Sequence, residues 1–154
     1  MLWRLAMRIE FLTIRLPWLI VLFVLALSAG RVQAANVLLT PAVAAQISID
    51  VLDTNANFYA TFAELINQYG DDKPTLDQKV DVERTLLRDS LSVLYANNNT
   101  TALTYTQYCS KNSAAIEKFM TDNPAFKTTL EEAKAELVNF QNQVEVLLEQ
   151  KGLK

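Results

Sequence analysis

The sequence predicts an all-α protein, folded as an up-down-up-down antiparallel four-helix bundle. Apolar residues recur at steps of three and four over most of residues 41–150, which is the period of an amphipathic helix. After residue 34, each proline falls where a helix would begin and each glycine where one would end. No stretch alternates polar and apolar residues for long enough to predict a strand. Short loops make consecutive helices antiparallel neighbours, which gives the bundle.

Residues 1–34 predict a signal peptide that is removed on export. Arginines precede an apolar run of 14 residues from 16 to 29, and residues 32–34 supply the small side chains that a signal peptidase reads. A spanning helix needs about 20 residues, so cleavage near Ala34 is favoured over an uncleaved anchor. We therefore expect a periplasmic or extracellular protein with one domain over residues 35–154. Membrane contact is expected only through an uncleaved signal segment.

The charge balance argues against nucleic acid as a partner. Residues 1–34 contain four of the 14 basic side chains and one of the 17 acidic ones. Residues 35–154 therefore carry 10 basic and 16 acidic side chains, a net charge of −6. An acidic domain with scattered lysines has no electrostatic footprint for nucleic acid or an anionic membrane surface.

The first helix is predicted over 41–69, with Thr40 as N-cap, Pro41 in the first turn and Gly70 as C-cap. A helix whose apolar face is this wide has neighbours on two sides. Two apolar stripes make up that face: Ile47, Val51, Phe58, Phe62, Leu65 and Tyr69, and beside them Ile49, Leu52, Ala56, Tyr59, Ala63 and Ile66.

The second helix follows the turn at 71–74. Thr75 and Gln78 have the spacing of a capping box. Asn97, Asn98 and Asn99 end the helix, because asparagine tolerates the left-handed conformation of a helix end. One face of this helix carries Leu76, Val80, Leu87, Leu91 and Leu94.

The third helix is predicted over about 101–121 and ends at Asp122-Asn123-Pro124. The fourth repeats apolar residues at alternating steps of four and three, which is typical of a bundle seam. The seam consists of Phe126, Leu130, Ala133, Leu137, Phe140, Val144 and Leu147. The alternative is three helices, in which the third and fourth stack into one long rod kinked at Pro124.

The sequence does not predict an enzyme, a cofactor or a metal site. Without histidine there is no Ser-His-Asp or Cys-His nucleophile and no imidazole ligand. Gly70 and Gly152, the only glycines after residue 34, cannot build a phosphate-binding loop. Asp50 and Asp53 could share a helix face and bind a hard cation. However, carboxylate pairs of this kind are more typical of a solvated face.

Five aromatic residues are candidates for an apolar ligand pocket or an interface. They are Phe58, Tyr59 and Phe62 on the first helix, and Tyr105 and Tyr108 on the third. Small ligands bind in the interiors of helical bundles. Aromatic rings at helical spacing need no ligand to explain them, so filling of the core is favoured.

Cys109 is the only cysteine, and it lies one heptad before Ile116 on an apolar stripe. This placement favours an inert core position over an intermolecular disulfide, and a disulfide over a reactive thiol. Asn98 and Asn99 both begin N-x-[ST] motifs. They would be glycan acceptors in a eukaryotic secreted protein and helix-capping residues in a bacterial periplasm; the bacterial reading is favoured.

The function predicted from these features is that of a small secreted or periplasmic, non-enzymatic bundle that binds other proteins. It would act as an adapter, a chaperone-like protein or an envelope-associated protein, through a groove or through self-association along the wide face of its first helix. The alternative is a carrier or sensor that holds a small apolar ligand among the aromatic residues.

Overall fold

The computed structural model describes residues 39–153, and these form five helices and no strand. The helices are α1 (Pro41–Tyr69), α2 (Lys73–Asn97), α3 (Ala102–Lys111), α4 (Ser113–Asp122) and α5 (Pro124–Gln150). The predicted all-α class is therefore confirmed. The predicted signal peptide lies outside the described residues.

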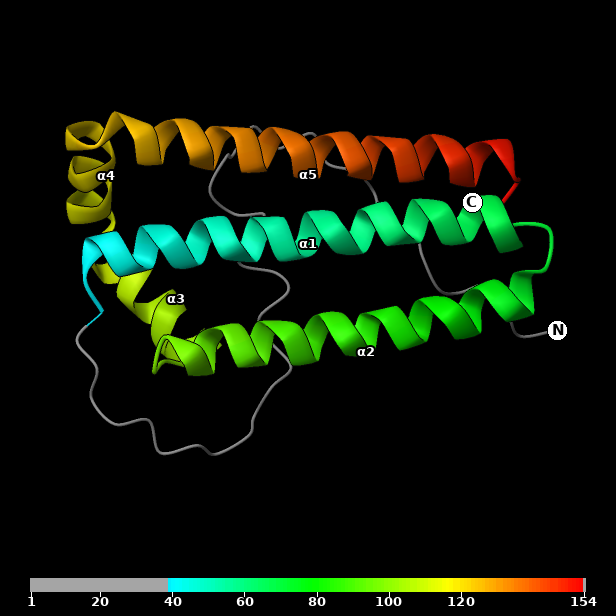
Figure 1. Cartoon of the computed structure of the whole chain (residues 1–154), viewed down its shortest axis with the longest axis horizontal. Coiled ribbons are helices and arrows are strands. Elements are labelled where there is room, and N and C mark those ends of the chain that lie inside the picture. Colours follow the sequence, from blue (N-terminus) through cyan, green and yellow to red (C-terminus); the bar gives the residue numbers. More distant parts are fainter. Residues whose placement is uncertain (1–38, 154) are drawn as a thin grey trace, which may run out of the picture.

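Three long helices lie side by side, with α1 between α5 and α2 (Figure 1). α2 runs antiparallel to α1, as expected for helices joined by a short turn. α5 runs parallel to α1. This direction agrees with an ion pair of 2.9 Å between Lys151 Nζ, just after α5, and Asp71 Oδ2, just after α1.

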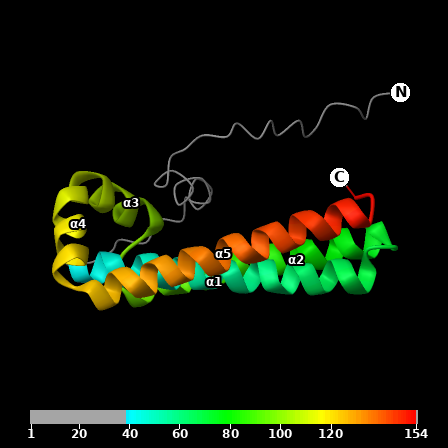
Figure 2. The same cartoon turned by 90° about the horizontal axis from the view of Figure 1, so that it is seen from above.

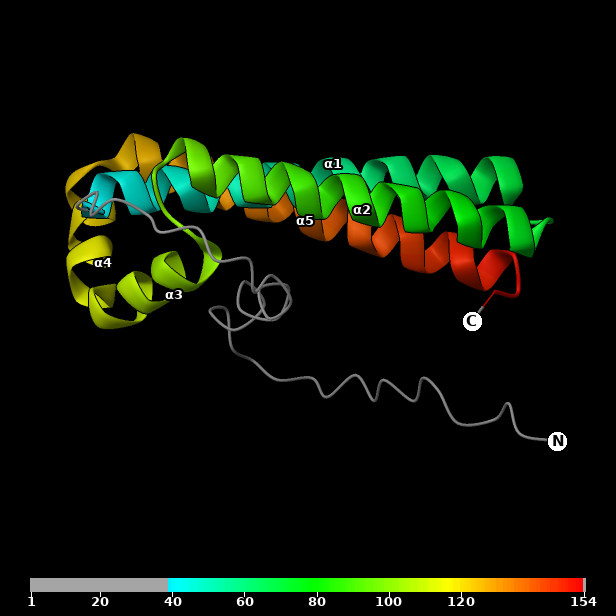
Figure 3. The same ribbon diagram turned by 90° about the horizontal axis from the view of Figure 1, so that it is seen from below.

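The up-down-up-down arrangement does not form among the described residues. In place of one long third helix, α3 and α4 have 10 residues each, and each therefore spans only about 15 Å. They project from one face of the three-helix layer at the end where α1 begins (Figures 2 and 3). Between α2 and α5 the chain therefore does not cross the length of the molecule again, and α5 starts at the same end as α1.

The alternative of a long kinked rod is also wrong, because α4 lies across the end of the layer and α5 runs along it (Figure 1). The unexpected break is at Asn112, which caps both short helices. Its Nδ2 donates to the Tyr108 carbonyl at 2.9 Å, and its own carbonyl accepts from Ala115 and Ile116. Asparagine side chains compete in this way with continued helix.

The predicted start of α1 is confirmed: Thr40 Oγ1 accepts from the Val43 N–H at 3.2 Å, and Pro41 follows. α2 differs, because Asp72 is its N-cap and Thr75 lies within the first turn. The Asp72 carboxylate accepts from the Thr75 N–H at 3.3 Å and from its hydroxyl at 2.7 Å. An aspartate cap leaves Pro74 in the first turn, where its missing N–H is tolerated.

The core consists of three clusters along the layer. The first joins the start of α1 to the end of α2 and to the short helices; its buried members are Leu39, Ala44, Ile47, Val51, Leu91, Tyr95, Tyr105 and Ile116. The second joins α1, α4 and α5 through Ala45, Ile49, Leu52, Ala56, Met120, Leu130, Ala133 and Leu137. The third closes the far end with Ala63, Ile66, Leu76, Val80 and Val144. Both apolar stripes of α1 are therefore covered by other helices.

Candidate interaction surface

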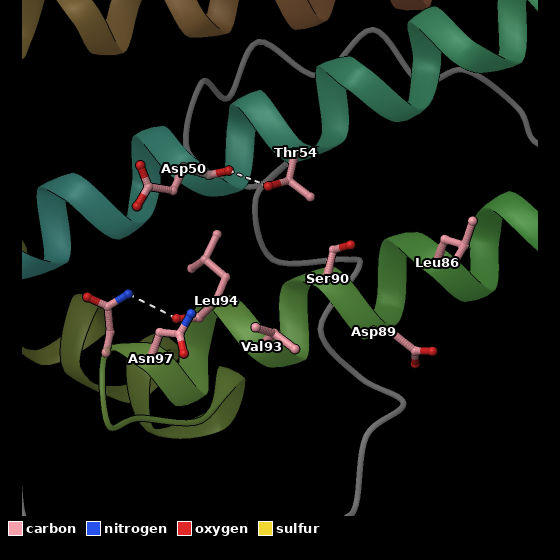
Figure 4. A pocket seen from close by; sticks show the side chains of 9 residues that line it. Asp50, Thr54, Leu86, Asp89, Ser90, Val93, Leu94 and Asn97 are labelled. Carbon is pink, nitrogen blue, oxygen red and sulfur yellow. Dashed lines mark hydrogen bonds between the residues drawn. The ribbon is translucent and has the colours of Figure 1, made fainter.

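An open groove of about 620 Å³ lies between α1 and the second half of α2. In Figure 4, Ser90 and Leu94 point from α2 toward α1, whereas Asp89 points away from it. The groove is lined by Asp50 and Thr54 of α1 and by Leu86, Asp89, Ser90, Val93, Leu94, Asn97 and Asn98 at the α2 side. Its lining therefore mixes apolar side chains of α2 with polar side chains from both helices.

Three large apolar side chains of α2 are exposed beside this groove. Val82, Leu86 and Val93, which we call the α2 stripe, have 53%, 52% and 58% of their surface exposed. They are four and seven residues apart, so they share one face of the helix. Large apolar groups that follow one helix face are typical of a surface that binds a partner.

The packing of α2 explains why this stripe faces outward. Leu76, Val80 and Leu91 are buried against α1, and they occupy a different side of the helix from the α2 stripe. No other described helix covers that outer side, because α5 packs on the other flank of α1 (Figure 1). The α2 stripe is therefore a second apolar face on a helix whose first face already belongs to the core.

Of the charged groups around the stripe, Lys79 and Asp89 are exposed and Asp50 is half-buried. Asp50 accepts a hydrogen bond from Gln46 Nε2 at 2.8 Å. Asp89 lies 3.7 Å from Arg88 Nε, with both side chains about two-thirds exposed, and an exposed contact of this kind contributes little. Lys79 forms no ion pair with any residue in 39–153.

The five predicted aromatic residues do not converge on one cavity. Phe58 packs edge-on against Tyr59, with ring centroids 5.4 Å apart, and lies 6.1 Å from Phe62. Tyr59 and Phe62 add to the cores shared with α5 and α2. Tyr105 and Tyr108 belong to the first cluster, at the end where α1 begins. The structure therefore divides them between the middle and one end of the molecule.

Tyr105 anchors α3 to α1. Its hydroxyl lies 2.6 Å from Ser48 Oγ, which in turn donates to the Ala44 carbonyl at 2.9 Å. Burial, followed by the nearby Cys109, raises the pKa of Tyr105 far above its ordinary value. The ring of Tyr95 lies 5.6 Å away, and burial raises the pKa of its hydroxyl to about 12. The Tyr95 hydroxyl has no hydrogen-bond partner among the described residues.

Cys109 is half-buried and packs against the first core cluster. Burial raises the pKa of its thiol, and the neighbouring Tyr105 hydroxyl opposes that shift. A raised pKa lowers the thiolate fraction, and the thiolate is the reactive form. The geometry therefore agrees with a packed position that retains partial access to solvent.

The carboxylates of α1 do not form a metal-binding group. Slight burial, then Glu136 of α5, then Asp50 raise the pKa of Asp53. No group of three or more carboxylate or cysteine ligands comes together within residues 39–153. On α2, the carboxylates of Asp77 and Asp81 form exposed ion pairs. Asp77 Oδ1 lies 3.3 Å from Lys73 Nζ, and Asp81 Oδ1 lies 3.0 Å from Arg84 Nη1.

The asparagines after α2 have different roles. Asn98 is half-buried, and its Nδ2 donates to the Leu94 carbonyl at 2.9 Å. Asn99 is exposed and has a φ of +50°, the left-handed conformation expected at this helix end. Within residues 39–153, no helix combines the length and the apolar character needed to span a membrane.

The α2 stripe was not predicted from the sequence. The pattern was present, since Val82, Leu86 and Val93 repeat at steps of four and seven. It was hidden by a stronger stripe of leucines and valines on another side of the helix, which already accounted for the helical period. Comparison with known proteins finds no matching family, curated protein or solved structure.

Proposed function

We propose that this is a small exported, non-enzymatic protein that works by binding another protein through the α2 stripe. It acts as an adapter, a chaperone-like protein or an envelope-associated protein in the periplasm or extracellular space. The single observation that carries the proposal is the presence of three large apolar side chains, each more than half exposed, on one face of α2.

Burial of this stripe would supply useful binding energy. Full burial of a Val or Leu side chain contributes about 1.5–3 kcal/mol. Because Val82, Leu86 and Val93 are each about half exposed, covering all three contributes roughly 2–4 kcal/mol. The polar side chains that line the adjoining groove would orient the partner. A helical segment lying along α2 is the simplest shape that covers the stripe and the groove together.

The titratable groups support a non-enzymatic role. The chain has no histidine, and the strongly shifted groups, Tyr95 and Tyr105, are buried in the core rather than placed in the groove. A catalytic site normally places perturbed groups in a cleft that substrate can reach. Here the groove and the perturbed groups are made of different residues.

Chemical crosslinking of the exported protein in its native environment tests the proposal. Leu86→Asp should abolish the crosslinked product, because it places a charge in the centre of the covered face. Val146→Asp on α5 is the matched control, since Val146 is 50% exposed, and it should retain the product. Equal products from both variants would contradict a role for the α2 stripe.

Native mass spectrometry separates this proposal from the apolar-ligand carrier. We expect the purified protein to show only masses of the chain and its protein complexes. A lipid or metabolite that stays bound to the wild type, and is lost on substitution of Tyr59 or Phe62, would replace the proposal by the carrier.

A further inference from the structure

We propose that the partner of the α2 stripe is the α2 stripe of a second copy of this chain. The two helices lie antiparallel, with a two-fold axis at the level of residue 84. This inference rests on the proposed function, because it names the partner of the same surface. Its basis is the order of charged and apolar residues along that surface.

The outer face of α2 has the spacing of a coiled-coil seam. Steps of four and three connect Thr75, Lys79, Val82, Leu86, Asp89, Val93 and Ala96. The apolar members Val82 and Leu86 lie at the centre of this seam. Lys79 lies on one side of them and Asp89 on the other, and both side chains are exposed. The seam is therefore apolar in the middle, with one charge of each sign at equal distances from it.

An antiparallel pair makes these positions complementary. With the axis at residue 84, Val82 of one copy lies opposite Leu86 of the other. Lys79 of each copy lies opposite Asp89 of the other, so two ion pairs flank the apolar centre. Thr75 then lies opposite Val93. In this register each a position of one helix meets a d position of the other, as in an antiparallel coiled coil. The charged residues of the seam fix the register.

A parallel pair in register is disfavoured by the same residues. It would place Lys79 against Lys79 and Asp89 against Asp89, on a seam partly shielded from water. Like charges placed opposite each other at an interface oppose association and select against that arrangement. The charge order therefore chooses the antiparallel direction.

The groove fits this arrangement. In the antiparallel register, residues 75–82 of the second copy run beside residues 86–93. Lys79 of that copy then lies opposite Asp89, which is one of the residues that line the groove. Glu83 opposes the pairing, because it is next to the axis and faces its own counterpart. We therefore expect a dimer that dissociates on dilution and does not grow further, since a two-fold contact closes on itself.

Sedimentation equilibrium on protein expressed from the full-length sequence tests the inference by charge reversal. Lys79→Glu alone places two acidic groups opposite each other, and Asp89→Lys alone places two lysines opposite each other. Each variant should dimerise at least about tenfold more weakly than wild type, which corresponds to 1.4 kcal/mol. An equimolar mixture of the two should regain dimerisation, because each ion pair is then restored with its sign reversed.

Two controls exclude trivial causes. Lys127→Glu, an exposed lysine near the start of α5, should dimerise like wild type, which removes net charge as an explanation. Thermal unfolding by circular dichroism should be similar for all variants, because Lys79 and Asp89 lie outside the core. Single variants that dimerise like wild type, or a mixture that stays monomeric, would overturn the inference.

Failure of this inference can be told apart from failure of the proposed function. A wild-type protein that is monomeric at every concentration overturns self-pairing. If Leu86→Asp still abolishes the crosslinked product of the native environment, the α2 stripe binds a different protein and the proposed function holds. If Leu86→Asp also leaves that product unchanged, both the inference and the proposed function are wrong.

Discussion

At the residue scale, two buried tyrosines at the end where α1 begins make opposite contributions to stability. The Tyr105 hydroxyl is hydrogen-bonded to Ser48 at 2.6 Å, whereas the Tyr95 hydroxyl has no partner among residues 39–153. A buried polar group without a partner costs about 1–3 kcal/mol, and a satisfied hydrogen bond stabilises by about 1 kcal/mol. The same chemical group therefore has opposite effects at two neighbouring positions.

Replacement of each tyrosine by phenylalanine tests this difference. Tyr95→Phe should raise the free energy of unfolding by about 1–3 kcal/mol, because it removes an unsatisfied hydroxyl. Tyr105→Phe should lower it by about 1 kcal/mol, because the hydrogen bond between the Tyr105 hydroxyl and Ser48 is lost. Urea unfolding followed by circular dichroism measures both changes. A larger loss for Tyr95→Phe than for Tyr105→Phe would contradict the hydrogen-bond pattern.

The raised pKa values of Cys109, Tyr95 and Tyr105 predict lower stability in alkali. Each group is neutral when protonated, and burial disfavours its charged form in the folded state. As the pH rises past 9 for the thiol and 10 for the phenols, the unfolded chain loses protons before the folded one. The stabilising contribution is therefore complete below these values and declines as the pH approaches the folded-state pKa, about 12 for Tyr95.

Urea unfolding between pH 8 and pH 12 measures this effect. Wild type should lose roughly 2–3 kcal/mol through Tyr95 alone, at about 1.4 kcal/mol for each unit of pKa. Tyr95→Phe should show a shallower decline, because phenylalanine does not titrate. Cys109→Ser should remove the part of the decline that begins near pH 9. Identical profiles for all three proteins would contradict burial as the cause.

At the element scale, the sequence predicts helices best where a cap and a proline coincide. Thr40 with Pro41 sets the start of α1, and Asn123 with Pro124 divides α4 from α5. The break at Asn112 was not predicted, because Cys109 and Ile116 keep their heptad spacing across it. The spacing of apolar residues alone does not distinguish one long helix from two short helices in succession. The polar stretch Ser110–Ser113 was the local signal for the break.

Gly70 shows how an element end depends on tertiary packing. Its φ of −60° is an ordinary right-handed value, so conformational freedom does not require glycine here. Instead, a Cβ atom at this position would lie 2.5 Å from the Ile66 carbonyl oxygen and 3.0 Å from Cγ of Lys151. The sequence predicted the cap correctly, but the close approach of Lys151 could be found only in the fold.

Gly70→Ala should therefore destabilise the protein by about 1–3 kcal/mol, as expected when a well-packed position is overfilled. The loss should be accompanied by weakening of the Lys151–Asp71 ion pair, which lies next to the glycine. Asn67→Ala on the exposed side of the same last turn is the control, and it should change the stability by less than about 0.5 kcal/mol. Thermal unfolding of the two variants compares them directly. Similar melting temperatures would contradict the packing constraint.

At the scale of the whole molecule, the topology follows from the length of two helices. α3 and α4 are too short to cross the layer, so α5 returns beside α1 in the same direction. The core residues of α1 and α5 were largely predicted from their apolar seams. The seam of a helix marks its buried face whether the helix runs parallel or antiparallel to its neighbour. The direction of α5 depends on the missed break at Asn112, so it could not be predicted.

The open arrangement also explains the candidate surface. A complete four-helix bundle would give each long helix neighbours on two sides, whereas here α2 packs mainly against α1 and meets α5 only in the third core cluster. The α2 stripe faces outward on the side that a further helix would cover. The sequence predicted a protein-binding bundle, and the proposed binding face is the side of α2 that the fold leaves exposed.

The most direct test of this account is methyl NMR of the valines and leucines as the protein concentration rises. The signals of Val82, Leu86 and Val93 should shift together, because a second copy covers them. The signals of Val138 and Val146 should stay constant, since these residues are equally exposed on α5 but lie outside the proposed contact. Constant signals from the α2 stripe, or shifts confined to α5, would contradict the account.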